Sequence, residues 1–140
     1  NDLEVMMKLP FEEGPFILAT DEGSFHGGDA SAPPPLALFV AGLTGCIMTQ
    51  IRAFAKRLKV SLNDLDVETR VVWDWEAKGR IYETGPRSFE IDVMIDSSDA
   101  VEKVVELINA AKKGCFLEQT LGQANTIRHR MKTPDGWVEV

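Results

Sequence analysis

The sequence predicts an α+β fold whose helices and strands follow in the order ββ-α-ββ-αα-ββ. Several segments alternate apolar and polar side chains at period two, which is typical of half-buried strands, whereas one long segment repeats apolar side chains at helical spacing. The 140 residues, of which 44% are hydrophobic, have room for one core. We therefore expect a single domain over residues 1–140.

The N-terminal quarter predicts a hairpin followed by a loop. Residues 3–9 carry apolar side chains at every odd position, and a turn at 10–15 leads to a short second strand at 16–18. Residues 21–35 are rich in Gly, Ser, Ala and Pro, which predicts a loop. The prolines that end this loop lead into a helix, because proline fits the first helical turn.

Residues 36–58 predict a central helix of about six turns, roughly 35 Å long. Its charged residues lie only in the second half, so the first half is expected to be buried. The apolar residues at helical spacing are Leu36, Val40, Leu43, Ile47, Ile51, Phe54 and Leu58.

The C-terminal half predicts an antiparallel sheet, packed on the central helix, and two further helices. Residues 65–76 and 89–95 alternate as two strands with one wet face. A helix opens near Asp99, whose spacing to Glu102 is that of a capping box, and ends at Gly114. A short helix over 115–124 follows, and then a hairpin formed by residues 126–132 and 137–140.

Charge and hydropathy exclude two classes of partner. The 15 basic and 22 acidic residues give a net charge of −7, which repels nucleic acid. The longest continuous apolar run, residues 36–43, is far shorter than a membrane span, and no basic segment followed by an apolar stretch opens the chain. We expect a cytoplasmic protein that binds neither membrane nor nucleic acid.

Two cysteines, Cys46 and Cys115, are the candidate reactive groups. They are too few for a disulfide scaffold and lack the close spacing of a zinc ribbon. The two histidines, His26 and His129, do not complete a zinc-ligand spacing with them. We therefore expect neither a metal nor an organic cofactor.

Cys46 lies in a strip of small residues on the central helix. Gly42, Gly45, Cys46 and Thr49 share one side of the helix, and each mid-helix glycine is unfavourable relative to alanine. The strip admits a backbone, a ligand or a second sulfur, although close helix packing is the stronger explanation for an isolated buried cysteine.

Cys115 follows Lys112, Lys113 and Gly114 at the expected start of a helix. Free N–H groups and nearby positive charge there favour the thiolate, although a small residue filling a tight turn is the alternative. If both sulfurs line one pocket, one can be oxidised to a sulfenic acid that the other resolves as a disulfide.

The cysteine segments resemble the OsmC/Ohr family of thiol-dependent hydroperoxide reductases. The segment Pro-Pro-Leu-Ala-Leu-Phe-Val-Ala-Gly-Leu-Thr-Gly-Cys46 is similar to the proline-led first cysteine helix of the family, and Cys115-Phe-Leu-Glu-Gln-Thr-Leu resembles the second. The resemblance covers essentially the whole chain and implies an OsmC-like fold that forms an intertwined homodimer.

By this resemblance the chain reduces organic hydroperoxides, with Cys46 as the peroxidatic thiol and Cys115 as the resolving thiol. An external dithiol, a lipoyl protein in some members, then reduces the disulfide. We expect Glu118, Gln50 and His26 to support the pair.

Two positions depart from the family pattern. Leu36 and Ala37 stand where the family has a glutamate, and no arginine precedes Arg52, whereas the family pairs an N-terminal arginine with the peroxidatic thiolate. Without that charge, burial would raise the pKa of Cys46. Substitutes from elsewhere in the fold are Lys8, Arg87 and Arg128. The alternative is a non-catalytic relative that binds an apolar small molecule at the dimer interface or senses redox state.

Overall fold

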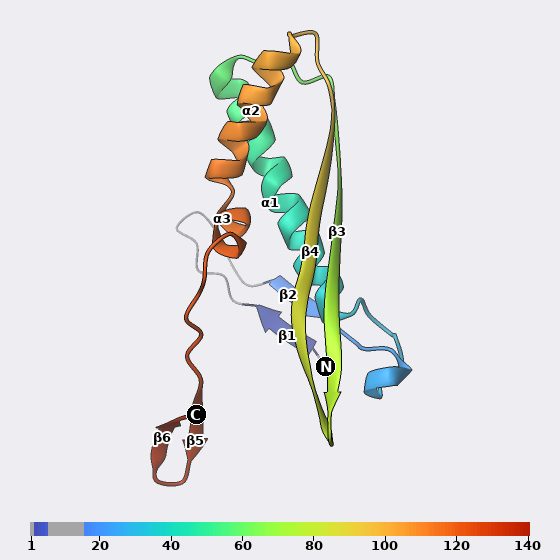
Figure 1. Cartoon of the computed structure of the whole chain (residues 1–140), viewed down its shortest axis with the longest axis vertical. Coiled ribbons are helices and arrows are strands. Elements are labelled where there is room, and N and C mark those ends of the chain that lie inside the picture. The colour runs from blue at the N-terminus through green and yellow to red at the C-terminus, as the bar shows by residue number, and fades with distance from the viewer. Residues whose placement is uncertain (1, 6–15) are drawn as a thin grey trace.

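The computed structural model describes residues 2–5 and 16–140, and the predicted order of helices and strands is confirmed (Figure 1). The turn predicted at 10–15 and the second half of the strand predicted over 3–9 lie outside the described residues. The elements are β1 (Asp2–Val5), β2 (Phe16–Ala19), a 3-10 turn (Ser24–His26), α1 (Pro35–Leu58), β3 (Asp64–Lys78), β4 (Ile81–Asp96), α2 (Val101–Gly114), α3 (Phe116–Leu121), β5 (Arg130–Thr133) and β6 (Gly136–Glu139).

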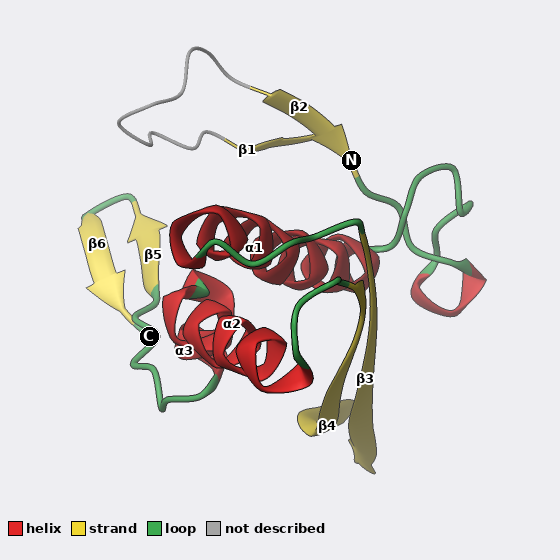
Figure 2. Cartoon of the chain, turned by 90° about the horizontal axis from the view of Figure 1, so that it is seen from above, coloured by secondary structure: helices red, strands yellow, loops and turns green. Residues whose placement is uncertain are grey.

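Helix α1 is the central element of the fold. It begins at Pro35, where a missing N–H costs nothing because the first turn has no intrahelical acceptor, and it ends where Lys59 adopts a left-handed conformation. Its buried residues fall four apart and form one stripe: Leu43, Ile47, Ile51 and Ala55. Helices α2 and α3 pack against α1, and the long β3–β4 ribbon runs beside it (Figure 2).

The core lies where these three helices meet the start of β3. Ile51, Leu107 and Ala111 have no exposed surface, and Val60 and Leu65 close the end of the core beside the loop between α1 and β3. Each fully buried aliphatic side chain of this size contributes on the order of 1.5–3 kcal/mol to folding. The cysteine region is therefore built on the best-packed part of the molecule.

Strands β3 and β4 form one antiparallel ribbon, and β4 begins eight residues earlier than the alternation around Phe89 predicts. The pairing passes from Val72–Ser88 to Trp73–Pro86, so a bulge leaves Arg87 without an opposite residue. Within the described part of the chain the strands make three separate two-stranded sheets, and neither terminal hairpin joins the ribbon (Figure 1).

The predicted capping box at the start of α2 is wrong. The N-cap is Ala100, without a side-chain hydrogen bond. Asp99 instead accepts hydrogen bonds from the Ser61 backbone N–H at 2.6 Å and from the Lys103 ammonium at 3.0 Å. Because Ser61 lies in the loop after α1, the carboxylate links that loop to the start of α2.

By length and composition alone, α1 could cross a membrane, since its mean hydropathy over an 18-residue window is 1.5. The expectation from the short continuous run differs because scattered polar residues such as Thr44 and Thr49 interrupt the run without lowering the mean much. A mostly buried core helix of a soluble protein passes the same test, but only 17% of this window is buried. The expectation that the first half of the helix is buried is wrong for the single chain, where Leu36 and Phe39 are exposed.

Candidate functional site

Cys115 forms the junction between α2 and α3. Its backbone is extended, with φ −78° and ψ 112°, so it ends α2 and caps α3 instead of lying inside a helix, as the prediction over 115–124 had it. The backbone N–H of Gln119 donates to the Cys115 carbonyl at 2.9 Å, which opens α3. The side chain has no exposed surface and belongs to the hydrophobic core.

Cys46 lies on α1 beside this junction. The two thiols lie close enough for Cys46 to affect the pKa of Cys115, although they are far apart in the sequence, and neither is in a disulfide. Cys46 is half-buried and packs against the edge of the core, whereas Cys115 is completely enclosed. An oxidant approaching from solvent therefore meets Cys46 first.

Burial raises the pKa of the Cys115 thiol, and the neighbouring Cys46 raises it further. The backbone N–H groups of Glu118 and Leu117 act in the opposite direction without reversing the result. The expectation of a Cys115 thiolate at the helix start beside the two lysines is therefore wrong, because desolvation outweighs the backbone N–H groups there. Cys115 rests as a protonated thiol.

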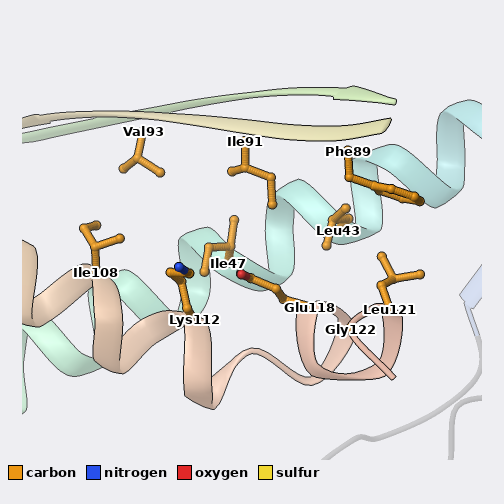
Figure 3. Close-up of a pocket in the computed structure, with 10 residues that line it drawn as sticks. All are labelled: Leu43, Ile47, Phe89, Ile91, Val93, Ile108, Lys112, Glu118, Leu121 and Gly122. Atoms are coloured by element: carbon orange, nitrogen blue, oxygen red, sulfur yellow. The ribbon is translucent and has the colours of Figure 1, made fainter. Parts of the chain in front are cut away.

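A pocket of about 500 Å³ lies between the helices and the ribbon, and neither cysteine lines it (Figure 3). Its walls come from α1, β4, α2 and α3 and are mainly aliphatic and aromatic. Lys112 and Glu118, from either side of the α2–α3 junction, extend their charged ends into this apolar space (Figure 3). The remaining lining residues are Leu43, Ile47, Phe89, Ile91, Val93, Ile108, Leu121 and Gly122.

The other expected site residues lie in different places. Gln50 is half-buried on α1 and faces Gly114, and Glu118 lies next to Cys115 through its backbone and in the pocket through its side chain. His26 instead contacts the far end of the ribbon, where its Nε2 lies 3.1 Å from the Tyr82 hydroxyl and its Nδ1 lies 3.6 Å from Glu22.

The possible substitutes for the family arginine are engaged elsewhere or fall outside the description. Arg87 pairs with Asp74 on the ribbon, and Arg128 pairs with Glu139. The Lys8 side chain lies outside the described residues. Lys112 is the cation that the structure brings into the pocket beside the junction.

Sequence reasoning missed Phe54 as a neighbour of the α2–α3 junction. It lies eight residues after Cys46, on the same side of α1, and its ring contacts the position of Gly114. The four-residue repeat from Cys46 through Gln50 to Phe54 is a signal that could have found it. Within the described ranges, no three His, Cys, Asp or Glu side chains gather in a way that could hold a metal ion.

The fold and the paired thiols define a class: small α+β proteins in which a cysteine on a long central helix meets a second cysteine at a helix junction. A model of the OsmC-like protein family matches residues 27–130, well over half of the sequence. The chain belongs to the OsmC-like protein family. A comparison with curated proteins found no match.

Solved structures agree with this assignment. An OsmC-like hydroperoxide resistance protein from Jannaschia sp. CCS1 is 67% identical, with 99% of this chain and 88% of that chain covered and a TM-score of 0.77. An OsmC-like protein from Mycoplasma pneumoniae is 17% identical, with 88% and 80% covered and a TM-score of 0.65. The second similarity concerns the fold alone.

Proposed function

We propose that this chain is a thiol-dependent peroxidase that reduces organic hydroperoxides through Cys46 and Cys115. The observation that carries the proposal is the proximity of a half-buried thiol, Cys46, to an enclosed one, Cys115. The 67% identity to a hydroperoxide resistance protein supports the same activity. The mainly apolar pocket that reaches the α2–α3 junction at Lys112 and Glu118 suits an organic hydroperoxide better than hydrogen peroxide.

The reaction has three steps. The Cys46 thiolate attacks the distal oxygen of the hydroperoxide, the O–O bond breaks, and the alcohol leaves after taking up a proton. Cys46 is then a sulfenic acid, and the Cys115 sulfur attacks it to form a disulfide and release water. An external dithiol, by family resemblance that of a lipoyl protein, supplies the two electrons that restore both thiols.

The test is the rate of thiol loss with cumene hydroperoxide and with hydrogen peroxide, in wild type, Cys46→Ser and Cys115→Ser. We expect faster loss with the organic peroxide, a trappable sulfenic acid on Cys46 in Cys115→Ser, and no comparable reaction in Cys46→Ser. Thiol loss no faster than that of an ordinary buried cysteine would contradict the proposal.

We further propose that the active form is a homodimer. An open apolar groove of about 980 Å³ runs between the outer side of α1 and β3, and its lining includes Leu36, Ala41 and Trp73. Uncovered apolar surface of this extent favours a protein partner. Light scattering should give twice the chain mass for wild type and a single chain mass for Ala41→Glu. A wild-type mass equal to that of one chain would contradict the dimer.

The pocket supports a second candidate function, the binding of an apolar small molecule without catalysis. Leu36 and Ala37 replace the family glutamate, and the pocket is ready-made around Lys112 and Glu118. The probe is 1-anilinonaphthalene-8-sulfonate, titrated into the Cys46→Ser/Cys115→Ser variant. Saturable binding that Ile108→Asp abolishes, together with slow thiols in wild type, would favour this function over the peroxidase.

A further inference from the structure

One side of α1, from Gly42 to Phe54, packs against the α2–α3 junction. Successive contacts join the two: Leu117 Cδ1 lies 3.8 Å from where a Cβ on Gly42 would be, and Cys115 meets Cys46 one turn further along. The residues of α1 that form this side are spaced four apart: Gly42, Cys46, Gln50 and Phe54.

The closest of these contacts is at Gly114, the residue before Cys115. A Cβ at this position would lie 2.5 Å from Cε2 and 2.9 Å from Cζ of Phe54, closer than carbon atoms can approach. The Phe54 ring packs against the core, and the Arg57 guanidinium lies 5.7 Å from its centroid. The core and Arg57 therefore restrict the movement of the ring away from position 114.

The backbone conformation at position 114 does not require a glycine. Gly114 belongs to α2 and is not among the described glycines with positive φ, which are Gly27, Gly79 and Gly136. Alanine is favoured over glycine in a helix. What glycine supplies here is space: it lets the end of α2 approach the Phe54 ring.

We propose that Gly114 is a positioning residue for the step in which Cys115 resolves the Cys46 sulfenic acid; this inference rests on the proposed two-cysteine cycle. A methyl group at position 114 pushes the junction away from α1, and the displacement passes through one peptide unit to Cys115. Disulfide formation accepts only a narrow range of Cα–Cα separations, about 4.4–6.8 Å. The sulfur of Cys115 then reaches Cys46 less often, while the oxidation of Cys46 itself is unaffected.

The test compares Gly114→Ala with two matched variants. Gly42→Ala adds the same methyl group on the same face where the neighbouring atom leaves room, at 3.8 Å. Gly114→Ala/Phe54→Leu removes the ring that the new methyl group would meet. Two readouts are taken: the equilibrium fraction of the Cys46–Cys115 disulfide in glutathione buffers, and the lifetime of the Cys46 sulfenic acid after one equivalent of cumene hydroperoxide.

For Gly114→Ala we expect the disulfide equilibrium constant and the resolution rate to fall by at least about tenfold, since misplacement by about 1 Å has effects of this size. The rate of sulfenic acid formation on Cys46 should not change. Gly42→Ala and the double variant should match wild type in both readouts. A merely destabilising glycine substitution would change thermal unfolding without separating these two steps.

Gly114→Ala with wild-type resolution would overturn the inference, because the ring would then have moved instead of the junction. So would a double variant that resolves slowly or does not fold, since leucine at position 54 should give the methyl group room. If wild-type Cys46 does not react with cumene hydroperoxide, the proposed peroxidase function fails, whereas the glutathione equilibrium still tests the role of Gly114 independently.

Discussion

The helical core and the far end of the β3–β4 ribbon contain similar apolar residues in opposite environments. Leu107 in the core has no exposed surface, whereas Trp75 and Ile81 near the end of the ribbon are 62% and 66% exposed. The aromatic residues at that end contact mainly one another: Trp75 lies 6.0 Å from Tyr82 and 6.3 Å from Phe25, measured between ring centroids.

The difference shows that one chain completes the core around the cysteines but does not cover its own ribbon. A two-stranded ribbon has two faces and is marginally stable by itself, so distal residues gain little from folding unless something packs on them. The stability of the single chain is therefore concentrated where Cys46 and Cys115 meet. Substitutions in the two regions should separate these contributions.

The largest effect is expected in the core. Leu107→Ala removes a side chain with no exposed surface and leaves a cavity beside Ala111 and Ile51, so the free energy of unfolding should fall by about 2–5 kcal/mol. Urea denaturation measures the loss. A decrease below about 1 kcal/mol would mean that the helices rearrange to fill the space.

The next effect lies where the core meets the ribbon. The hydroxyl groups of Thr44 on α1 and Thr69 on β3 are 2.8 Å apart and half-buried. Thr44→Val keeps the shape but leaves Thr69 without this partner, so unfolding should become easier by about 1 kcal/mol. Thr49→Val is the control, because its hydroxyl is exposed and bonds only to Gly45 within the helix. Equal effects of the two variants in urea denaturation would refute a role for the α1–β3 hydrogen bond.

A smaller, pH-dependent effect is expected at Asp99. The Ser61 backbone N–H, and after it Lys103, lower the pKa of this carboxyl from 3.8 to about 2. Because the folded pKa is the lower one, the stabilisation is present above pH 3.8 and is lost as the pH falls towards 2.

The urea midpoint of Asp99→Asn should therefore be lower than that of wild type at pH 6, and the gap should close between pH 4 and 2. Asp66→Asn, at an exposed position on β3, serves as the control. A gap that stays constant down to pH 2 would show that the stabilisation does not depend on the Asp99 charge.

The smallest effect is expected at the exposed end of the ribbon. Trp75→Ala should change the free energy of unfolding by no more than about 0.5 kcal/mol at low protein concentration, where the chain is monomeric. If the ribbon end is covered in a dimer, the cost should grow with protein concentration. Titration of the urea midpoint against concentration distinguishes the two cases.

Much of this fold could be predicted from periodicity. Apolar residues recur every three to four positions in α1 and every two positions in the parts of β3 and β4 nearest the core, as expected of a helix and of strands. The missed features depend on contacts between distant residues. Asp99 has the sequence spacing of a helix cap, but its carboxylate instead accepts a hydrogen bond from the backbone N–H of Ser61, which the packing of the core brings close. At the site, both cysteines could be selected from the sequence, whereas the pKa direction at Cys115 could not, because burial is set by the packing of three helices.

The bulge at Arg87 changes which residues of β4, odd or even, lie on a given face of the ribbon. From Phe89 onward the odd residues of β4 face the same way as the odd residues of β3, but before Arg87 the even residues of β4 do so, as the pairs Trp73–Pro86 and Trp75–Thr84 show. One extra residue thus lets Tyr82 and Phe89 belong to a single continuous face despite the odd separation between them. A deletion of Arg87 would remove the bulge and leave the pairs of residues 81–86 as they are, whereas pairing Arg87 with Trp73 would move Tyr82 to the side now occupied by Glu83.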